Sequence, residues 1–170
     1  MAGNSNYQQY STSAGRSMTK GYEGWRSAPY QDPGGDNQSI GWGFNMDEGG
    51  IPKDVVSGKR EYSKKEAESL FQKKYTAAIK DSITFSGLDN FIKLSEGQRN
   101  VLIDMAYNMG LPTLNEFGGM QKAIGEQDYS RAALEMQYTN PDKIDRKETP
   151  WYKQTGGRAR NHVGQILGGD

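Results

Sequence analysis

Residues 20–45 read KGYEGWRSAPYQDPGGDNQSIGWGFN. A short helix is predicted where this stretch begins, because Met18, Tyr22 and Trp25 recur every three or four residues and so share one helical face. We expect this helix over 17–25. It ends before the Ala-Pro pair that follows, since the residue before a proline is displaced from the helical region.

The middle of the stretch predicts a β-hairpin. Residues 32–37 (DPGGDN) are rich in turn-forming residues, and short β-capable segments flank them around Tyr30 and over 40–44. Such a hairpin places Asp32 at its turn and Ser39 at the start of its second strand.

Helices follow over the rest of the chain. Residues 63–66 (SKKE) and 95–98 (SEGQ) are capping boxes, whose first and last side chains satisfy unpaired amides at a helix start. The first predicts a long helix over about 63–82, and the second predicts a central core helix that stops at Gly110 and Pro112. Further helices are predicted over about 115–124, 129–138 and 157–167.

Together these elements predict an α+β fold, in which a long helix joins a small N-terminal β-hairpin lobe to a larger helical lobe. Residues 1–16 are polar and show no helical or strand period, so we expect a flexible N-terminal arm. The remainder, 17–170, is long enough for one domain. Within it we place the β lobe at about 17–62, the inter-lobe helix at about 63–82 and the helical lobe at about 83–170.

Composition argues against several classes of protein. Lys plus Arg number 21 and Asp plus Glu number 21, so no net charge draws the chain onto nucleic acid or an anionic membrane. With no cysteine and one histidine, we expect no disulfide, metal site or cofactor. His162 is interpreted as a surface or half-buried structural histidine. No apolar run is long enough for a membrane span, and we expect no signal peptide.

Two carboxylates in the opening stretch suit hydrolysis of a glycosidic bond, which needs a proton donor on one side and a group that attacks or positions water on the other. Glu23 lies at the end of the short helix between Tyr22 and Trp25, where partial burial would raise its pKa. Asp32 lies in a glycine-rich turn and is expected to be ionised. The spacing alone is weak evidence, because the chain has 21 acidic residues.

Three short blocks carry a resemblance: KGYEG at 20–24, YQD at 30–32 and SIGWG at 39–43. They resemble the active-site segment of the phage-type lysozyme family, glycoside hydrolase family 24. In that family a Glu is followed after eight residues by an Asp or Cys, and after a short turn by a Thr-Ile-Gly-x-Gly strand.

Further blocks are similar to the same family in the same order. Residues 63–79 resemble its inter-lobe helix, and 102–110 resemble its central core helix. The segment WYKQT at 151–155, with Arg158, resembles a Trp-Tyr-Asn-Gln-Thr-x-x-Arg stretch, so the match spans about 18–167.

The resemblance implies a role for each matching residue. Glu23 would be the general acid, and Asp32 with Ser39 would position and activate the attacking water, with inversion at the anomeric carbon. Arg158 would pair with Glu23 and fix its orientation. The residues expected to bind substrate or shape the cleft are Tyr30, Gly43, Tyr107, Asn108, Phe117, Trp151, Thr155 and Arg158. For the aromatic ones, and for Trp42, ordinary core packing is the alternative.

The sequence departs from the family at two points. Ser39 stands where the family has Thr, which keeps the hydroxyl but loses the methyl that restricts its rotamer. The turn between Asp32 and Ser39 is one residue longer, so Asp36 is an alternative to Asp32.

The resemblance implies a lysozyme that cleaves the β-1,4 bond between N-acetylmuramic acid and N-acetylglucosamine, for cell-wall lysis or wall penetration by a virion. Its partners would be peptidoglycan glycan strands and either a holin or virion proteins, and we expect a monomer. It would wait in the host cytoplasm before acting on peptidoglycan in the periplasm, or travel in the virion. Three alternatives stay open: a weak or inactive peptidoglycan-binding virion module, a secreted antibacterial effector of the same fold, and a chitin or chitosan hydrolase.

Overall fold

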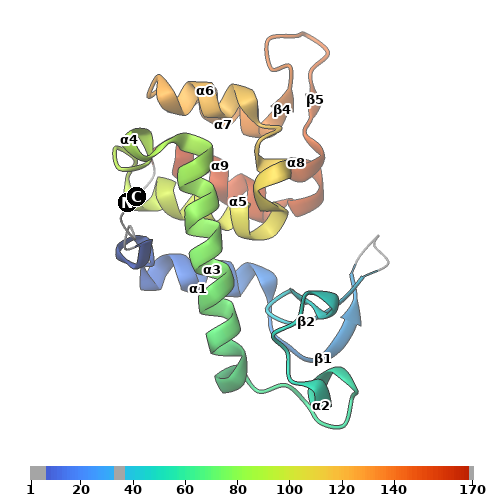
Figure 1. The fold of residues 1–170 in the computed structure, drawn as a ribbon. Helices are drawn as coiled ribbons and strands as arrows, with labels where there is room; N and C mark the ends of the chain where they lie inside the picture. The colour runs from blue at the N-terminus through green and yellow to red at the C-terminus, as the bar shows by residue number, and fades with distance from the viewer. Residues whose placement is uncertain (1–6, 33–36, 169–170) are drawn as a thin grey trace.

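The computed structural model describes residues 7–32 and 37–168, and it confirms the α+β fold (Figure 1). A three-stranded antiparallel sheet lies near the N-terminus, and most of the rest is helical. The first elements are η1 (Tyr7–Tyr10), α1 (Ser13–Glu23), β1 (Arg26–Gln31), β2 (Gln38–Gly41), β3 (Phe44–Asn45), η2 (Met46–Glu48), α2 (Lys53–Val56) and α3 (Lys64–Ser86). The later ones are α4 (Leu88–Phe91), α5 (Glu96–Leu114), α6 (Gly118–Gly125), α7 (Tyr129–Gln137), β4 (Tyr138–Thr139), β5 (Lys147–Glu148), α8 (Pro150–Thr155) and α9 (Gly157–Ile166).

Helix α1 begins four residues earlier than predicted and ends at Glu23 rather than at 25. Thr12 caps its start by accepting a hydrogen bond from the Gly15 amide (3.0 Å), and Gly24 ends it with a φ of 69°. The helix packs against α5 of the helical part, although the prediction placed its residues in the β lobe. Glu23 therefore lies where the helical part meets the sheet.

The flexible arm predicted for residues 1–16 is wrong over 7–16, because 7–10 form η1 and 13–16 begin α1. Tyr10 packs edge to face on Phe91, with ring centroids 5.2 Å apart, and Gln8 donates a hydrogen bond to Thr76 of α3 (3.0 Å). Aromatic rings supply apolar area that the polar composition of this segment conceals. Residues 1–6 lie outside the described residues.

The predicted hairpin is present as strands β1 and β2. Tyr30 faces Ser39 across the pair, and the Asp32 amide donates a hydrogen bond to the Asn37 carbonyl (3.1 Å) next to the turn. Strand β3, which sequence reasoning missed, pairs with β2 and makes β2 the central strand. Asp36, the alternative to Asp32, lies outside the described residues.

Both predicted capping boxes form, at Ser63 for α3 and at Ser95 for α5. Helix α3 runs from the sheet to the helical part, as Figure 1 shows, and packs along α5. It continues four residues beyond the predicted end and stops at Gly87, whose φ is 76°. Helix α5 breaks where predicted, at Gly110 (φ 74°, ψ 162°), and then continues for one further turn to Leu114.

The core extends from the sheet into the helical part along α3 and α5. Its largest fully buried side chains include Phe44, Phe71, Tyr75, Phe85, Phe91, Leu102, Ile103, Met105, Leu114 and Met120. Sequence reasoning missed α2, α4, α8 and the β4–β5 hairpin, whereas α6, α7 and α9 begin and end within three residues of their predicted bounds. Within the described part of the chain, no helix is long and apolar enough to cross a membrane.

Candidate active site

Glu23, the last residue of α1, has a side chain that is 15% exposed. One carboxyl oxygen, Oε1, accepts a hydrogen bond from Nη2 of Arg158 on α9 (2.9 Å), and Asn108 on α5 also hydrogen-bonds this carboxyl group. These contacts come from three helices that are distant in sequence. The carboxyl group is therefore held in one orientation by the tertiary fold.

The other carboxyl oxygen, Oε2, lies against Gly43, in the turn between β2 and β3. A Cβ atom added at Gly43 would stand 2.8 Å from Oε2, closer than real Cβ contacts allow. Gly43 also has a φ of 71°, which favours glycine. A side chain at this position would therefore displace or cover this oxygen.

Burial raises the pKa of Glu23 above its usual value, as the sequence predicted. The charge of Arg158 and the hydrogen bonds from Arg158 and Asn108 act in the opposite direction, and the charge of Asp104 adds to the rise. Burial prevails. A carboxyl group of this kind stays protonated to higher pH than an exposed glutamate and is suited to donate a proton.

Behind Arg158 lies Asp104, a fully buried carboxylate on α5 that sequence reasoning missed. Arg158 donates to both of its oxygens, from Nε to Oδ2 (2.7 Å) and from Nη2 to Oδ1 (2.9 Å). The Thr19 hydroxyl donates to Oδ1 (2.7 Å), and His162 makes a short hydrogen bond to Oδ2. Burial opposes the ionised form of Asp104, but the hydrogen bonds from His162 and Arg158 outweigh it and lower its pKa.

His162 is fully buried, so its interpretation as a surface or half-buried residue is wrong. Its ring packs against Tyr22 and Trp151 as well as bonding Asp104. A sequence pattern could have indicated this contact. Asp104 lies inside the apolar stripe of the central helix, and Arg158 and His162 are four residues apart on the last helix. That pattern marks a buried charge that needs partners.

Asp32, Ser39 and Tyr30 come together at the end of the β1–β2 hairpin. Ser39 is 4% exposed, and its hydroxyl donates a hydrogen bond to Oδ2 of Asp32 (2.9 Å). The pKa of Tyr30 is raised by burial and by the negative charges of Asp32 and Glu23, and its phenol hydrogen-bonds Ser39. The longer turn therefore still allows Asp32 and Ser39 to meet.

Tyr107 and Gly43 border a hollow of about 180 Å³ where the sheet meets α3 and α5. Its wall consists of Gly43, Lys74, Ala77, Ala78, Asp81, Ala106 and Tyr107. The Tyr107 hydroxyl donates to the carbonyl oxygen of Trp42 (3.1 Å), so it ties α5 to the turn that holds Gly43. Trp42 itself is 6% exposed and packs on Trp25 and Phe71, which makes it a core residue.

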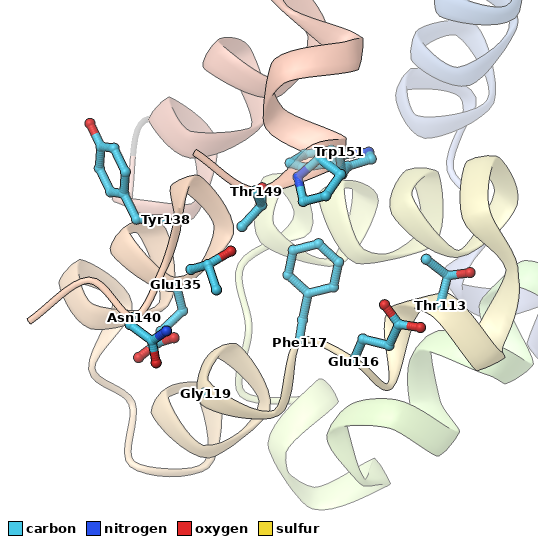
Figure 2. A pocket seen from close by; sticks show the side chains of 11 residues that line it. Thr113, Glu116, Phe117, Gly119, Glu135, Tyr138, Asn140, Thr149 and Trp151 are labelled. Atoms are coloured by element: carbon cyan, nitrogen blue, oxygen red, sulfur yellow. The ribbon is translucent and has the colours of Figure 1, made fainter. Parts of the chain in front are cut away.

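Phe117 and Trp151 meet edge to face in a second, larger hollow of about 390 Å³ in the helical part. Figure 2 shows its wall, made of Thr113, Glu116, Phe117, Gly119, Glu135, Tyr138, Thr139, Asn140, Thr149, Pro150 and Trp151. The hairpin β4–β5 supplies three of these residues, so an element that sequence reasoning missed shapes this hollow. Thr155 lines neither hollow, and its hydroxyl donates to the Trp151 carbonyl of its own helix (2.8 Å).

A proton-donating carboxyl group and a second carboxylate supported by a hydroxyl are what a glycoside hydrolase needs. A family model described as Phage lysozyme matches residues 20–155 of this chain. The chain therefore belongs to the phage lysozyme family of glycoside hydrolases, which hydrolyse peptidoglycan. The comparison with curated proteins gave no match. The matched segment ends at Thr155 and so does not include Arg158 or His162. Their contacts with Glu23 and Asp104 are seen in the structure alone.

Proposed function

We propose that this protein is an inverting N-acetylmuramidase that cleaves the β-1,4 bond between N-acetylmuramic acid and N-acetylglucosamine. One observation carries the proposal: in a chain of the phage lysozyme family, buried Glu23 is bonded to Arg158 through one oxygen while the other faces Gly43. The reaction divides between two groups of residues, one for the leaving oxygen and one for the attacking water.

Glu23 is the proposed general acid. Its Oε2 donates the proton to the glycosidic oxygen as the bond to the anomeric carbon breaks, while Arg158 and Asn108 keep the carboxyl group in place. Once deprotonated, the carboxylate is stabilised by the same two donors. The proton then returns from solvent.

Asp32 and Ser39 are proposed to hold the attacking water. The Ser39 hydroxyl donates a hydrogen bond to Oδ2 of Asp32, and Oδ1 is the proposed acceptor of a proton from water. The oxygen of that water attacks the anomeric carbon on the face opposite the leaving group, which inverts its configuration. Asp32 is therefore a general base here, and no covalent glycosyl-enzyme forms.

We further propose that the glycan strand lies between the sheet and the helical part, over the hollow at Gly43 and Tyr107. Phe117 and Trp151 are proposed to shape the cleft from the helical side, with Thr155 supporting α8 rather than touching sugar. The biological role would be lysis of the host wall from within, or penetration of the wall by a virion.

The test compares the wild type with Glu23→Gln and Asp32→Asn on purified Gram-negative sacculi. Loss of turbidity is followed, the reducing ends are identified by mass spectrometry after borohydride reduction, and the first anomer formed is identified by proton NMR. We expect N-acetylmuramic acid reducing ends of inverted configuration from the wild type. Glu23→Gln should lose at least about 100-fold in rate, since a general acid contributes about 10²–10⁴-fold.

Circular dichroism and thermal unfolding of each variant serve as the control for folding. An active Glu23→Gln protein would refute the assignment of the acid, and retention of configuration would refute the role of Asp32. A folded wild type without turnover would refute the proposed activity as a whole.

A further inference from the structure

Asp104 is the most completely enclosed charge near the proposed active site. Its side chain is fully buried and accepts hydrogen bonds from Thr19 on α1 and from Arg158 and His162 on α9. A carboxylate in such a place is costly unless it is paired and fully bonded. The two-point contact with Arg158 also fixes the plane of the guanidinium group.

The Nη2 nitrogen of Arg158 serves both carboxyl groups. It donates to Oδ1 of Asp104 and to Oε1 of Glu23, each at 2.9 Å. Because this nitrogen carries two hydrogens, one is available to each oxygen. The position of the Glu23 carboxyl group therefore depends on how Asp104 holds Arg158.

The charges of Asp104, Arg158 and Glu23 also influence one another. A guanidinium ion touching Glu23 favours its ionised form, which cannot donate a proton. Asp104 places a compensating negative charge against the same ion, at Nε and Nη2, so the pair it forms with Arg158 has no net charge. Glu23 then receives a hydrogen bond without a neighbouring excess of positive charge.

We propose that Asp104 is a positioning residue for the proposed general acid: it orients Arg158 and neutralises it, which keeps Glu23 protonated over the working pH range. This inference rests on the proposed function of Glu23. Other groups near Glu23 are Asn108 and Tyr107 on α5, Tyr30 on β1, Tyr22 on α1 and His162 on α9. Among them, burial raises the pKa of Tyr107 and Tyr30, so both phenols stay neutral while Glu23 titrates.

The test is the pH dependence of kcat/KM for Asp104→Asn, since the alkaline limb reports ionisation of the free enzyme's acid. The amide keeps the size of the side chain but leaves Arg158 uncompensated. We expect the limb to move to lower pH by about one pH unit, because a charge within about 4–6 Å moves a carboxyl midpoint by about 1–3 units and Asp104 is screened by Arg158. At a pH one unit above the new midpoint, kcat/KM of Asp104→Asn is about tenfold below its own low-pH plateau, whereas that of the wild type is only about twofold below its plateau.

Asp89→Asn serves as the control, because it removes an exposed carboxylate on α4 and should not move the limb. Arg158→Gln removes the positive charge of the same pair and should move the limb to higher pH. This variant keeps the proposal testable if Asp104→Asn does not fold. Equal loss of activity at every pH, with the limb in place in both variants, would overturn the proposal.

Carbon-13 NMR keeps this inference separable from the proposed function. The Glu23 carboxyl resonance, assigned by its loss in Glu23→Gln, is titrated in the wild type and in Asp104→Asn without any substrate. A lower midpoint in Asp104→Asn supports the charge balance even if the wild type proves inactive on sacculi. An unchanged midpoint refutes it even if the muramidase activity is confirmed.

Discussion

Gly43 has no side chain at the point where Oε2 of Glu23 approaches its backbone. Its φ of 71° and its contact with Oε2 of Glu23 impose two separate demands on this position. The first demand is conformational and is met by any glycine in a left-handed turn. The second concerns access to the proton that the carboxyl group would donate.

These two demands can be separated by a matched pair of variants. Gly58 has nearly the same φ, 70°, but a Cβ atom there would meet nothing within 4 Å. Gly43→Ala and Gly58→Ala should therefore each lose about 1–2 kcal/mol of stability from backbone strain. Gly43→Ala should additionally lose at least about tenfold in kcat, since misplacing a reacting group by about 1 Å can cost about 100-fold.

Urea unfolding and turnover of sacculi, measured for both alanine variants, give the comparison. Turnover by Gly43→Ala at the wild-type rate would show that Oε2 is not the oxygen that acts. Loss of activity in Gly58→Ala as large as in Gly43→Ala would point to general destabilisation instead.

At the same scale, sequence reasoning found the groups that lie in one short stretch, and the family resemblance implied the pair of Arg158 with Glu23, which the structure contains. Sequence reasoning missed Asp104 and the contact that His162 makes with it across the fold. Burial of Glu23 followed from its aromatic neighbours, and the predicted hairpin placed Asp32 and Ser39 near one turn, where the structure joins them by a hydrogen bond. Asp104 and Arg158 are 54 residues apart, so no local pattern pairs them. The catalytic roles of Glu23, Asp32 and Ser39 remain predictions until turnover is measured.

Among the elements, the sequence located the break in α5 correctly. Gly110 leaves the helical region with φ 74° and ψ 162°, two residues before Pro112, and the chain resumes a helical turn to Leu114. This break redirects the chain toward Phe117 and the larger hollow. A residue with a side chain would be strained there.

Gly110→Ala is therefore expected to lower the free energy of unfolding by about 1–3 kcal/mol. The nearest atom to the added methyl group is Cδ of Pro112 at 3.7 Å, so strain and not collision is responsible. Gly118→Ala is the control, because Gly118 begins α6 without a left-handed φ and its Cβ would meet nothing within 4 Å. The urea unfolding midpoints of Gly110→Ala and Gly118→Ala are compared. Equal stability of the two variants would contradict the strain argument.

Elements that the sequence did not reveal are those held by tertiary contacts. Helices α2 and α4 have four residues each, which is too short for a periodic apolar stripe. Strands β4 and β5 have two residues each, and their loop is fixed by Arg131 of α7, which bonds both Glu135 and Asp142. Capping boxes, by contrast, are local, and both were predicted correctly.

For the whole molecule, α3 connects the sheet to the helical part, and side chains from α1 reinforce that connection. Lys20 of α1 pairs with Glu68 of α3 (2.7 Å) and lies 4.4 Å from the ring centre of Trp42 and 4.5 Å from that of Phe71. The sheet, α1 and α3 are thus joined on the side where Glu23 lies. A glycan strand bound at Glu23 would contact both the sheet and the helical part, and these contacts of Lys20 fix the distance between the two.

The balance of charge over the molecule predicts how activity responds to salt. With 21 basic and 21 acidic residues, no net field draws the protein onto an anionic wall. We therefore expect the clearing rate of sacculi to change by less than about twofold between about 0.05 M and 0.2 M NaCl, although the Debye length falls over that range. The control is Asp89→Lys with Glu126→Lys, where each exchange adds two charges and the formal net charge rises from 0 to +4. Its rate should be higher at low salt and fall with added salt, whereas a tenfold fall for the wild type would reveal a local basic surface that steers binding.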